Sequence, residues 1–143
     1  MADTADAEHL VRAWYAAFDA GDREGMLALL SEDVVHDVNQ GPREHGRPAF
    51  RAFLGQMDRC YREGIHDLVV MVDATGRRAA AEFVVEGEYL ATDSGLPPAR
   101  GQRYRLPAGA FFEIREGRIA RVSTWYNLRD WIRQVGAAAA WAG

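Results

Sequence analysis

The order in which helical and strand-like periodicities follow one another constrains the fold of this chain most. Apolar residues recur at helical spacing in two short segments near the N-terminus, and again in a third segment that begins around Pro48. From His66 onward the apolar residues alternate with a period of two, through four long stretches that end at Trp125-Tyr126. Helices followed by long strands indicate an α+β fold. We therefore expect a cone-shaped, curved antiparallel or mixed sheet closed by three N-terminal helices.

Helix-capping signals set the expected boundaries of the helices. The first helix runs from about Ala7 to Ala20 and stops at Gly21, and Asp22 then caps a short second helix. The third helix carries a clear apolar stripe, made of Phe50, Phe53, Leu54, Met57 and Tyr61.

The long strands pair naturally into two hairpins. The segment from His66 precedes the long strand Ala79–Thr92, and Tyr104–Arg115 precedes Ile119–Leu128 across a tight turn. A short strand, Val34–Val38, comes before the third helix. All strand neighbours can be antiparallel in this arrangement.

The ends of the chain and its longest loop complete the predicted organisation. A short last helix follows Leu128, so residues 1–135 form one domain and the alanine-rich residues 136–143 form a mobile tail. The loop 93–101 is rich in proline and glycine. Long loops beside a rigid sheet often carry function, so this loop is either a lid or dimer contact, or a plain connection.

Composition narrows the classes of partner. Seventeen basic and 21 acidic residues give a net charge of −4, and the two signs are interspersed, which argues against nucleic acids and membranes. Cys60 is the one cysteine and the first residues carry no apolar signal run, so the expected location is the cytoplasm. The histidines show no metal-ligand spacing and the glycines no phosphate-binding fingerprint, so neither a metal nor a cofactor is expected.

Four short motifs occur in an order that is typical of a known family. They are Ala17–Asp22, Leu29–Val34, Gly46–Phe50 and Phe112–Ile119. Together they resemble the NTF2-like superfamily, in particular its SnoaL-like polyketide cyclase and ketosteroid isomerase branch, over nearly the whole domain. The resemblance implies a cone-shaped α+β barrel, a homodimer, and a small apolar or partly polar ligand inside the cone.

The residues that steroid isomerases use are only partly present. The resemblance places Trp14 where those enzymes have a tyrosine, and Ala110 where they have the aspartic acid of the oxyanion hole. The position of their carboxylate base falls on Val38 or Asp37, depending on the direction of counting. Loss of one oxyanion-hole donor typically costs about 10²–10³ in rate, so steroid isomerase activity is not expected.

His36 and Asp37 are the candidate catalytic residues. Imidazole titrates near neutral pH, and burial raises the pKa of a carboxyl group, so either side chain can carry a proton. Because side chains alternate along a strand, only one of the two is expected to face the interior. The alternative is that His36 is a half-buried structural histidine, while Asp37 or Asn39 bonds the turn before Gly41.

The remaining candidates form a ligand-binding wall. They are Trp14, Asn39, Phe53, Leu54, Met57, Asp58, Ala110, Phe112 and Tyr126. Two hypotheses follow from the resemblance and from these residues. The first is a cofactor-independent SnoaL-like enzyme that transfers protons on a small apolar carbonyl compound, as an isomerase, cyclase or dehydratase. The second is a non-catalytic ligand-binding or accessory dimer that has kept the cone and lost the isomerase machinery.

Overall fold

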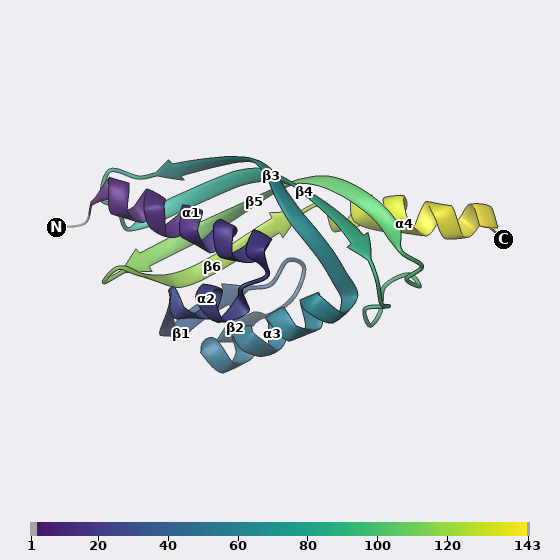
Figure 1. Ribbon diagram of the computed structural model, residues 1–143, viewed down its shortest axis with the longest axis horizontal. Helices are drawn as coiled ribbons and strands as arrows, with labels where there is room; N and C mark the ends of the chain where they lie inside the picture. The colour runs from purple at the N-terminus through teal and green to yellow at the C-terminus, as the bar shows by residue number, and fades with distance from the viewer. Residues whose placement is uncertain (1–2, 143) are drawn as a thin grey trace.

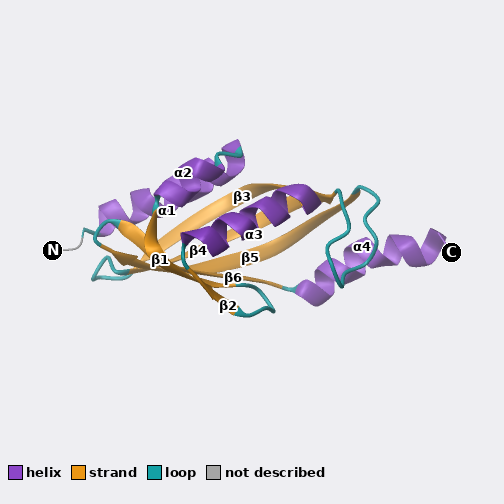
Figure 2. Ribbon diagram, turned by 90° about the horizontal axis from the view of Figure 1, so that it is seen from below, coloured by secondary structure: helices purple, strands orange, loops and turns teal. Residues whose placement is uncertain are grey.

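The protein forms one curved sheet with helices on its concave side (Figure 1). The computed structural model describes the backbone of residues 3–142 and the side chains of residues 3–136. The elements in chain order are α1 (Thr4–Ala20), α2 (Arg23–Ala28), β1 (Leu30–Asp37), β2 (Arg43–His45), α3 (Arg47–Cys60), β3 (Tyr61–Val72), β4 (Arg78–Tyr89), β5 (Gln102–Arg115), β6 (Arg118–Tyr126) and α4 (Leu128–Ala142). The helices α1, α2 and α3 lie on one side of the sheet, while α4 extends from its end (Figure 2).

The sheet is mixed, as the sequence allowed. Its strand order is β2-β1-β6-β5-β4-β3, and every neighbouring pair is antiparallel except β1 and β6, which are parallel. The expectation that all neighbours can be antiparallel is therefore wrong for this one pair. A parallel pair needs a long crossover, and here β2, α3 and the strands β3, β4 and β5 lie between β1 and β6 in the sequence.

The caps expected at the first two helices are present. Gly21 ends α1 in the left-handed region with φ of 70°, a conformation that glycine adopts without steric cost. Asp22 then caps α2, and its Oδ1 accepts a hydrogen bond of 2.8 Å from the backbone N–H of Gly25. The helix α1 starts at Thr4, earlier than expected, because Asp3 caps it through the N–H of Ala5.

Several boundaries differ from those expected. The strand β1 starts at Leu30 and not at Val34, and β2 was not foreseen. The strand β3 starts at Tyr61, directly after α3, and a bulge near Asp67 shifts its register. The helix α4 continues to Ala142. The predicted mobile tail is residues 136–143, and the structure describes the exposure of residue 136 alone among them. The mobility of the tail remains a prediction.

We call the side of the sheet toward α1, α2 and α3 the inner face, and the opposite side the outer face. Alternate residues of β4 and β5 are buried on the inner face, where Tyr15 of α1 packs against Phe83 and Phe112. From α4, Trp131 packs edge-on against Tyr89 at 4.8 Å between ring centroids. The helix α4 therefore closes one end of the cone. No helix among the described residues is long and apolar enough to cross a membrane.

Candidate active site

A cavity of about 340 Å³ lies between the inner face and the helices. Most of its wall is apolar, which is typical of sites for small organic ligands, and its volume is at the lower end of the usual range. Polar side chains interrupt the wall at several points, namely Tyr15, Arg23, His36, Asn39, Gln40, Asp58, Tyr61, Glu63, Asp93, Ser94, Thr124 and Tyr126. These polar groups decide which chemistry the cavity supports.

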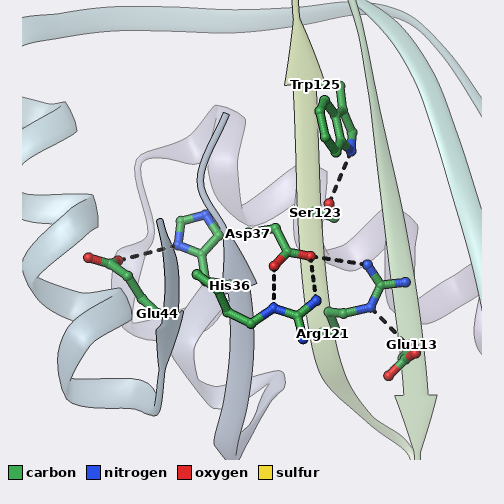
Figure 3. Close-up of polar contacts among 8 residues, drawn as sticks. His36, Asp37, Glu44, Glu113, Arg121, Ser123 and Trp125 are labelled. Atoms are coloured by element: carbon green, nitrogen blue, oxygen red, sulfur yellow. Dashed lines mark hydrogen bonds and ion pairs between the residues drawn. The ribbon is translucent and has the colours of Figure 1, made fainter. Parts of the chain in front are cut away.

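His36 is buried in this wall, with 4% of its surface exposed. Its ring stacks on Phe50 at 4.2 Å between centroids and meets Phe53 edge-on at 4.5 Å. Its Nδ1 lies 3.8 Å from Oε1 of Glu44, the residue opposite it on β2 (Figure 3). Both atoms are buried and have no hydrogen-bond partner among the described residues. The separation of 3.8 Å is longer than a hydrogen bond, and a short movement of either side chain brings Nδ1–H within hydrogen-bond distance of Oε1.

Burial lowers the pKa of His36 to about 4, although the nearby charge of Asp37 acts in the opposite direction. The imidazole is therefore neutral at pH 7. Because Nδ1 faces a carboxylate oxygen, its proton is favoured on that nitrogen. The second nitrogen, Nε2, then carries the free lone pair and acts as the base of the ring.

Asp37 lies on the other face of the sheet, as strand alternation requires (Figure 3). Its Oδ1 accepts a hydrogen bond of 2.6 Å from Arg43 Nε, and its Oδ2 one of 3.3 Å from Arg121 Nη1. The hydrogen bond from Arg43 is the main reason that the pKa of Asp37 lies below its ordinary value. Asp37 is thus an ionised, paired carboxylate outside the cavity, and the two candidate catalytic residues are not brought together.

Most of the expected ligand-binding residues line the cavity. These are Trp14, Asn39, Phe53, Leu54, Met57, Asp58 and Tyr126. Ala110 and Phe112 are buried and do not line it, because the cavity meets β5 further toward the start of the strand, at Leu106 and Ala108.

Comparison with known proteins places this fold and cavity in a family. The family model for a SnoaL-like domain matches residues 11–122. The chain belongs to the SnoaL-like family. The resemblance inferred from the four sequence motifs is therefore confirmed.

Solved structures agree with this assignment. A Pseudomonas putida protein, provisionally assigned as a polyketide cyclase, is 62% identical over 90% of this chain and 97% of its own, with a TM-score of 0.89. A second provisional polyketide cyclase, from Xanthomonas campestris, is 55% identical over 90% of this chain and 96% of its own, with a TM-score of 0.88. An NTF2-like protein from Burkholderia xenovorans is 16% identical over 94% of this chain and 99% of its own, with a TM-score of 0.73, and shows the fold alone. No curated protein matches this chain significantly.

Two expected polar residues of the SnoaL-like cavity are held by neighbours. Asn39 donates a hydrogen bond of 3.2 Å from Nδ2 to the backbone carbonyl of Tyr126, which fastens the segment after β1 to the end of β6. Asp58 stands at the rim, where Arg23 binds its Oδ1 through Nη2 at 2.7 Å and through Nε at 3.0 Å. Asp58 is therefore engaged in an ion pair with Arg23.

The loop after β4 covers part of the SnoaL-like cavity, with Asp93 and Leu96 among the lining residues. Asp93 Oδ2 accepts a hydrogen bond of 2.8 Å from the hydroxyl of Tyr61. The hydroxyl of Tyr89 donates to the carbonyl of Pro97 at 2.7 Å. These bonds hold the loop against the wall of the cavity, and a role for it as a lid remains a prediction. A dimer contact through this loop remains a prediction.

Sequence reasoning missed Tyr61, Glu63 and Asp93 as wall residues of this SnoaL-like protein. The signal for Glu63 was its position two residues after Tyr61, in the inward phase of β3, but the period of two was recognised only from His66 onward. Among the described residues, no three side chains of histidine, cysteine, aspartate or glutamate gather as a metal site.

The depressed pKa of His36 predicts a pH-dependent loss of stability. Between pH 6.5 and about 4, the unfolded chain binds a proton on this histidine and the folded protein does not. The free energy of unfolding therefore falls as the pH drops through this window, by about 3 kcal/mol for this one group. In His36→Gln this contribution is absent. Urea unfolding of both proteins from pH 7 to pH 4 measures the difference, and parallel curves would contradict the prediction.

Proposed function

We propose that this SnoaL-like protein is a cofactor-independent enzyme that transfers a proton next to the carbonyl group of a small, mainly apolar compound. Isomerases, cyclases and dehydratases share this step. The observation that carries the proposal is His36, a neutral imidazole in the cavity wall whose Nδ1 faces the carboxylate of Glu44. A base held in one tautomer by a carboxylate is an arrangement suited to general base catalysis.

The mechanism begins with His36. Its Nε2 accepts a proton from the carbon next to the carbonyl group. The electron pair of the C–H bond forms a carbon–carbon double bond, and the π pair of the carbonyl group moves onto its oxygen to give the enolate. The imidazolium that forms is stabilised by Glu44, because a short movement closes the 3.8 Å gap into an ion pair. A proton then returns from His36 to the same carbon or, where the enolate is conjugated with a second double bond, to a different carbon, and the proton on His36 can exchange with solvent in between. No net proton is gained or lost over the cycle.

Tyr126 is the donor we assign to the developing enolate oxygen. It lines the cavity, and burial raises its pKa, with a smaller opposite effect from the hydrogen bond with Asn39. Its hydroxyl therefore keeps its proton and donates a hydrogen bond. Trp14 offers a second donor, the indole N–H, in the same wall. In this proposal, the Tyr126 hydroxyl and the Trp14 indole N–H together take the role that the oxyanion hole has in steroid isomerases.

The second candidate function is ligand binding without catalysis. It is favoured by Trp14 and Ala110, which stand where the resemblance places a tyrosine and an aspartic acid. Against it, the cavity is not filled by these side chains, and His36 forms part of its wall.

An exchange experiment separates the two functions. The probe is 2-tetralone, an uncharged bicyclic ketone with acidic protons beside its carbonyl group, and 2-naphthol has the shape of its enol. In D₂O, we expect the protein to accelerate exchange of these protons with solvent, as followed by NMR, and 2-naphthol to inhibit the exchange. Binding of 2-naphthol without any acceleration would favour the non-catalytic alternative.

We also propose that the protein is a homodimer through the outer face. Four large apolar side chains are about half-exposed there, with exposed fractions of 49% for Val69, 50% for Met71, 52% for Phe111 and 51% for Trp125. The strand register places these side chains in two rows of the same face, and a second copy of that face covers them.

Light scattering tests this dimer. At micromolar concentration the mass is expected to be twice the monomer mass of 15.9 kDa. The change Phe111→Glu places a charge in the centre of the patch and is expected to give a folded monomer. A wild-type monomer, or a dimer that survives the substitution, would contradict this interface.

A further inference from the structure

Three strands bring an unusual trio of residues side by side on the inner face. In the sheet register Glu63 of β3 is opposite Gly87 of β4, and Gly87 is opposite Tyr104 of β5. A glycine inside a long strand is unfavourable unless another group approaches the backbone closely. The approaching group here is the ring of Tyr104.

The ring of Tyr104 crosses the strand at the place where Gly87 lacks a side chain. A Cβ atom at position 87 would lie 2.4 Å from the hydroxyl oxygen of Tyr104 and 2.5 Å from Cζ, which real structures do not allow. Through this gap the hydroxyl reaches Glu63 and donates a hydrogen bond of 2.5 Å to Oε2. Gly87 therefore makes the contact between Tyr104 and Glu63 possible.

Glu63 is a half-buried acid that the mechanism so far does not use. Its side chain lines the cavity. Burial raises its pKa, while the hydrogen bond from Tyr104 and the charge of Arg23 act in the opposite direction. Arg23 itself is bound to Asp58 of α3. Other titratable groups around Glu63 include Tyr61 from β3 and Tyr126 from β6, which line the same cavity, and Asp19 from α1, whose Oδ1 accepts a hydrogen bond from the N–H of Ile65.

One oxygen of the Glu63 carboxyl group is hydrogen-bonded within the protein, and the other is free to contact a ligand. Oε2 accepts the hydrogen bond from Tyr104, whereas Oε1 has no hydrogen-bond partner among the described residues. A protonated carboxyl group held in this way presents a donor to a ligand in the cavity. His36 and Glu63 come from β1 and β3, which are separated by three strands of the curved sheet, and both line the same cavity.

We propose that Glu63 is a second catalytic residue, the general acid that protonates the substrate's carbonyl oxygen while His36 removes the proton from carbon. Tyr104 is its positioning residue. This inference rests on the proposed function. In the step, the C–H bond breaks, its electron pair forms the carbon–carbon double bond of the enol, and the carbonyl oxygen takes the proton of Glu63. The reverse transfers at another carbon restore both residues. The substrate class is an uncharged ketone, bound with its carbonyl oxygen toward Glu63 and the adjacent carbon toward His36.

A titration tests the state of Glu63 without any substrate. Carbon-13 NMR of glutamate-labelled protein, assigned with Glu63→Gln, is expected to show Glu63 titrating above the ordinary value for glutamate, which is about 4.3. The variant Tyr104→Phe removes a donor to the carboxylate and raises this pKa further. Gly87→Ala displaces the Tyr104 ring and has the same effect. The matched control is Gly64→Ala, where the nearest atom to a new Cβ lies 3.8 Å away.

Exchange of 2-tetralone tests the catalytic role. Glu63→Gln keeps the shape and the contact with Tyr104 but has no acidic proton, so exchange is expected to slow about 10²-fold. An ordinary Glu63 titration, or full exchange by Glu63→Gln, would overturn this inference and leave His36 as the base. Absence of exchange by the wild-type protein would overturn the proposed function, and the catalytic role of Glu63 with it.

Discussion

Replacing His36 by glutamine is expected to slow the exchange of 2-tetralone by about 10²–10⁴-fold, the usual contribution of a general base. Glutamine fills most of the space of the imidazole and can still face Glu44, but its amide does not accept a proton near neutral pH. The fold is expected to remain, because Phe50 and Phe53 still pack around the side chain. Exchange measured by proton NMR in D₂O, at one fixed protein concentration, gives the ratio of rates.

A second histidine provides the control for this change. His45 lies on the exposed short strand β2, and the same substitution there, His45→Gln, is expected to leave the exchange rate unchanged. A loss of exchange in both variants would point to a general effect on stability. Full exchange in His36→Gln, with His45→Gln also active, would rule out His36 as the base.

The order of elements was predictable because each segment carries its own local signal. Period 3.6 marks the helices, Asp22 marks a cap, and alternation marks β4, β5 and β6. The pairing of β1 with β6 was not predictable in this way, since strand partners that lie far apart in sequence share no local pattern. Because a long crossover separates β1 from β6, no local pattern in the sequence indicates that the two strands are parallel.

The site was predictable only in part, for reasons that the strands make clear. Alternation correctly indicated that one of His36 and Asp37 faces inward. The bulge near Asp67 shifts the register of β3, so that Leu68 and the residues two and four positions later face inward after it, while Glu63 and Ile65 do so before it. Extending the later phase backwards would have placed Glu63 on the outer face. Because of this bulge, the alternation after His66 does not predict that Glu63 lies on the inner face.

Phe112→Ala is expected to destabilise the protein by about 3–5 kcal/mol, because it empties a fully buried site between the sheet and α1. Phe112 has an exposed fraction of 0% and its ring meets Tyr15 edge-on at 6.1 Å. It does not line the cavity, so the loss does not arise from a change in ligand binding. Urea unfolding, followed by tryptophan fluorescence, measures the change in the free energy of unfolding.

The neighbouring residue makes this prediction a test of strand register. Phe111 lies on the outer face with 52% of its surface exposed, so Phe111→Ala should change the intrinsic stability of one chain much less. Because Phe111 also belongs to the proposed dimer interface, its substitution should instead make the unfolding midpoint depend differently on protein concentration. Measurements over a range of concentrations separate the two effects. If Phe111→Ala cost as much as Phe112→Ala at every concentration, the inner and outer faces of β5 would be wrongly assigned, and with them the phase that places Tyr104 over Gly87.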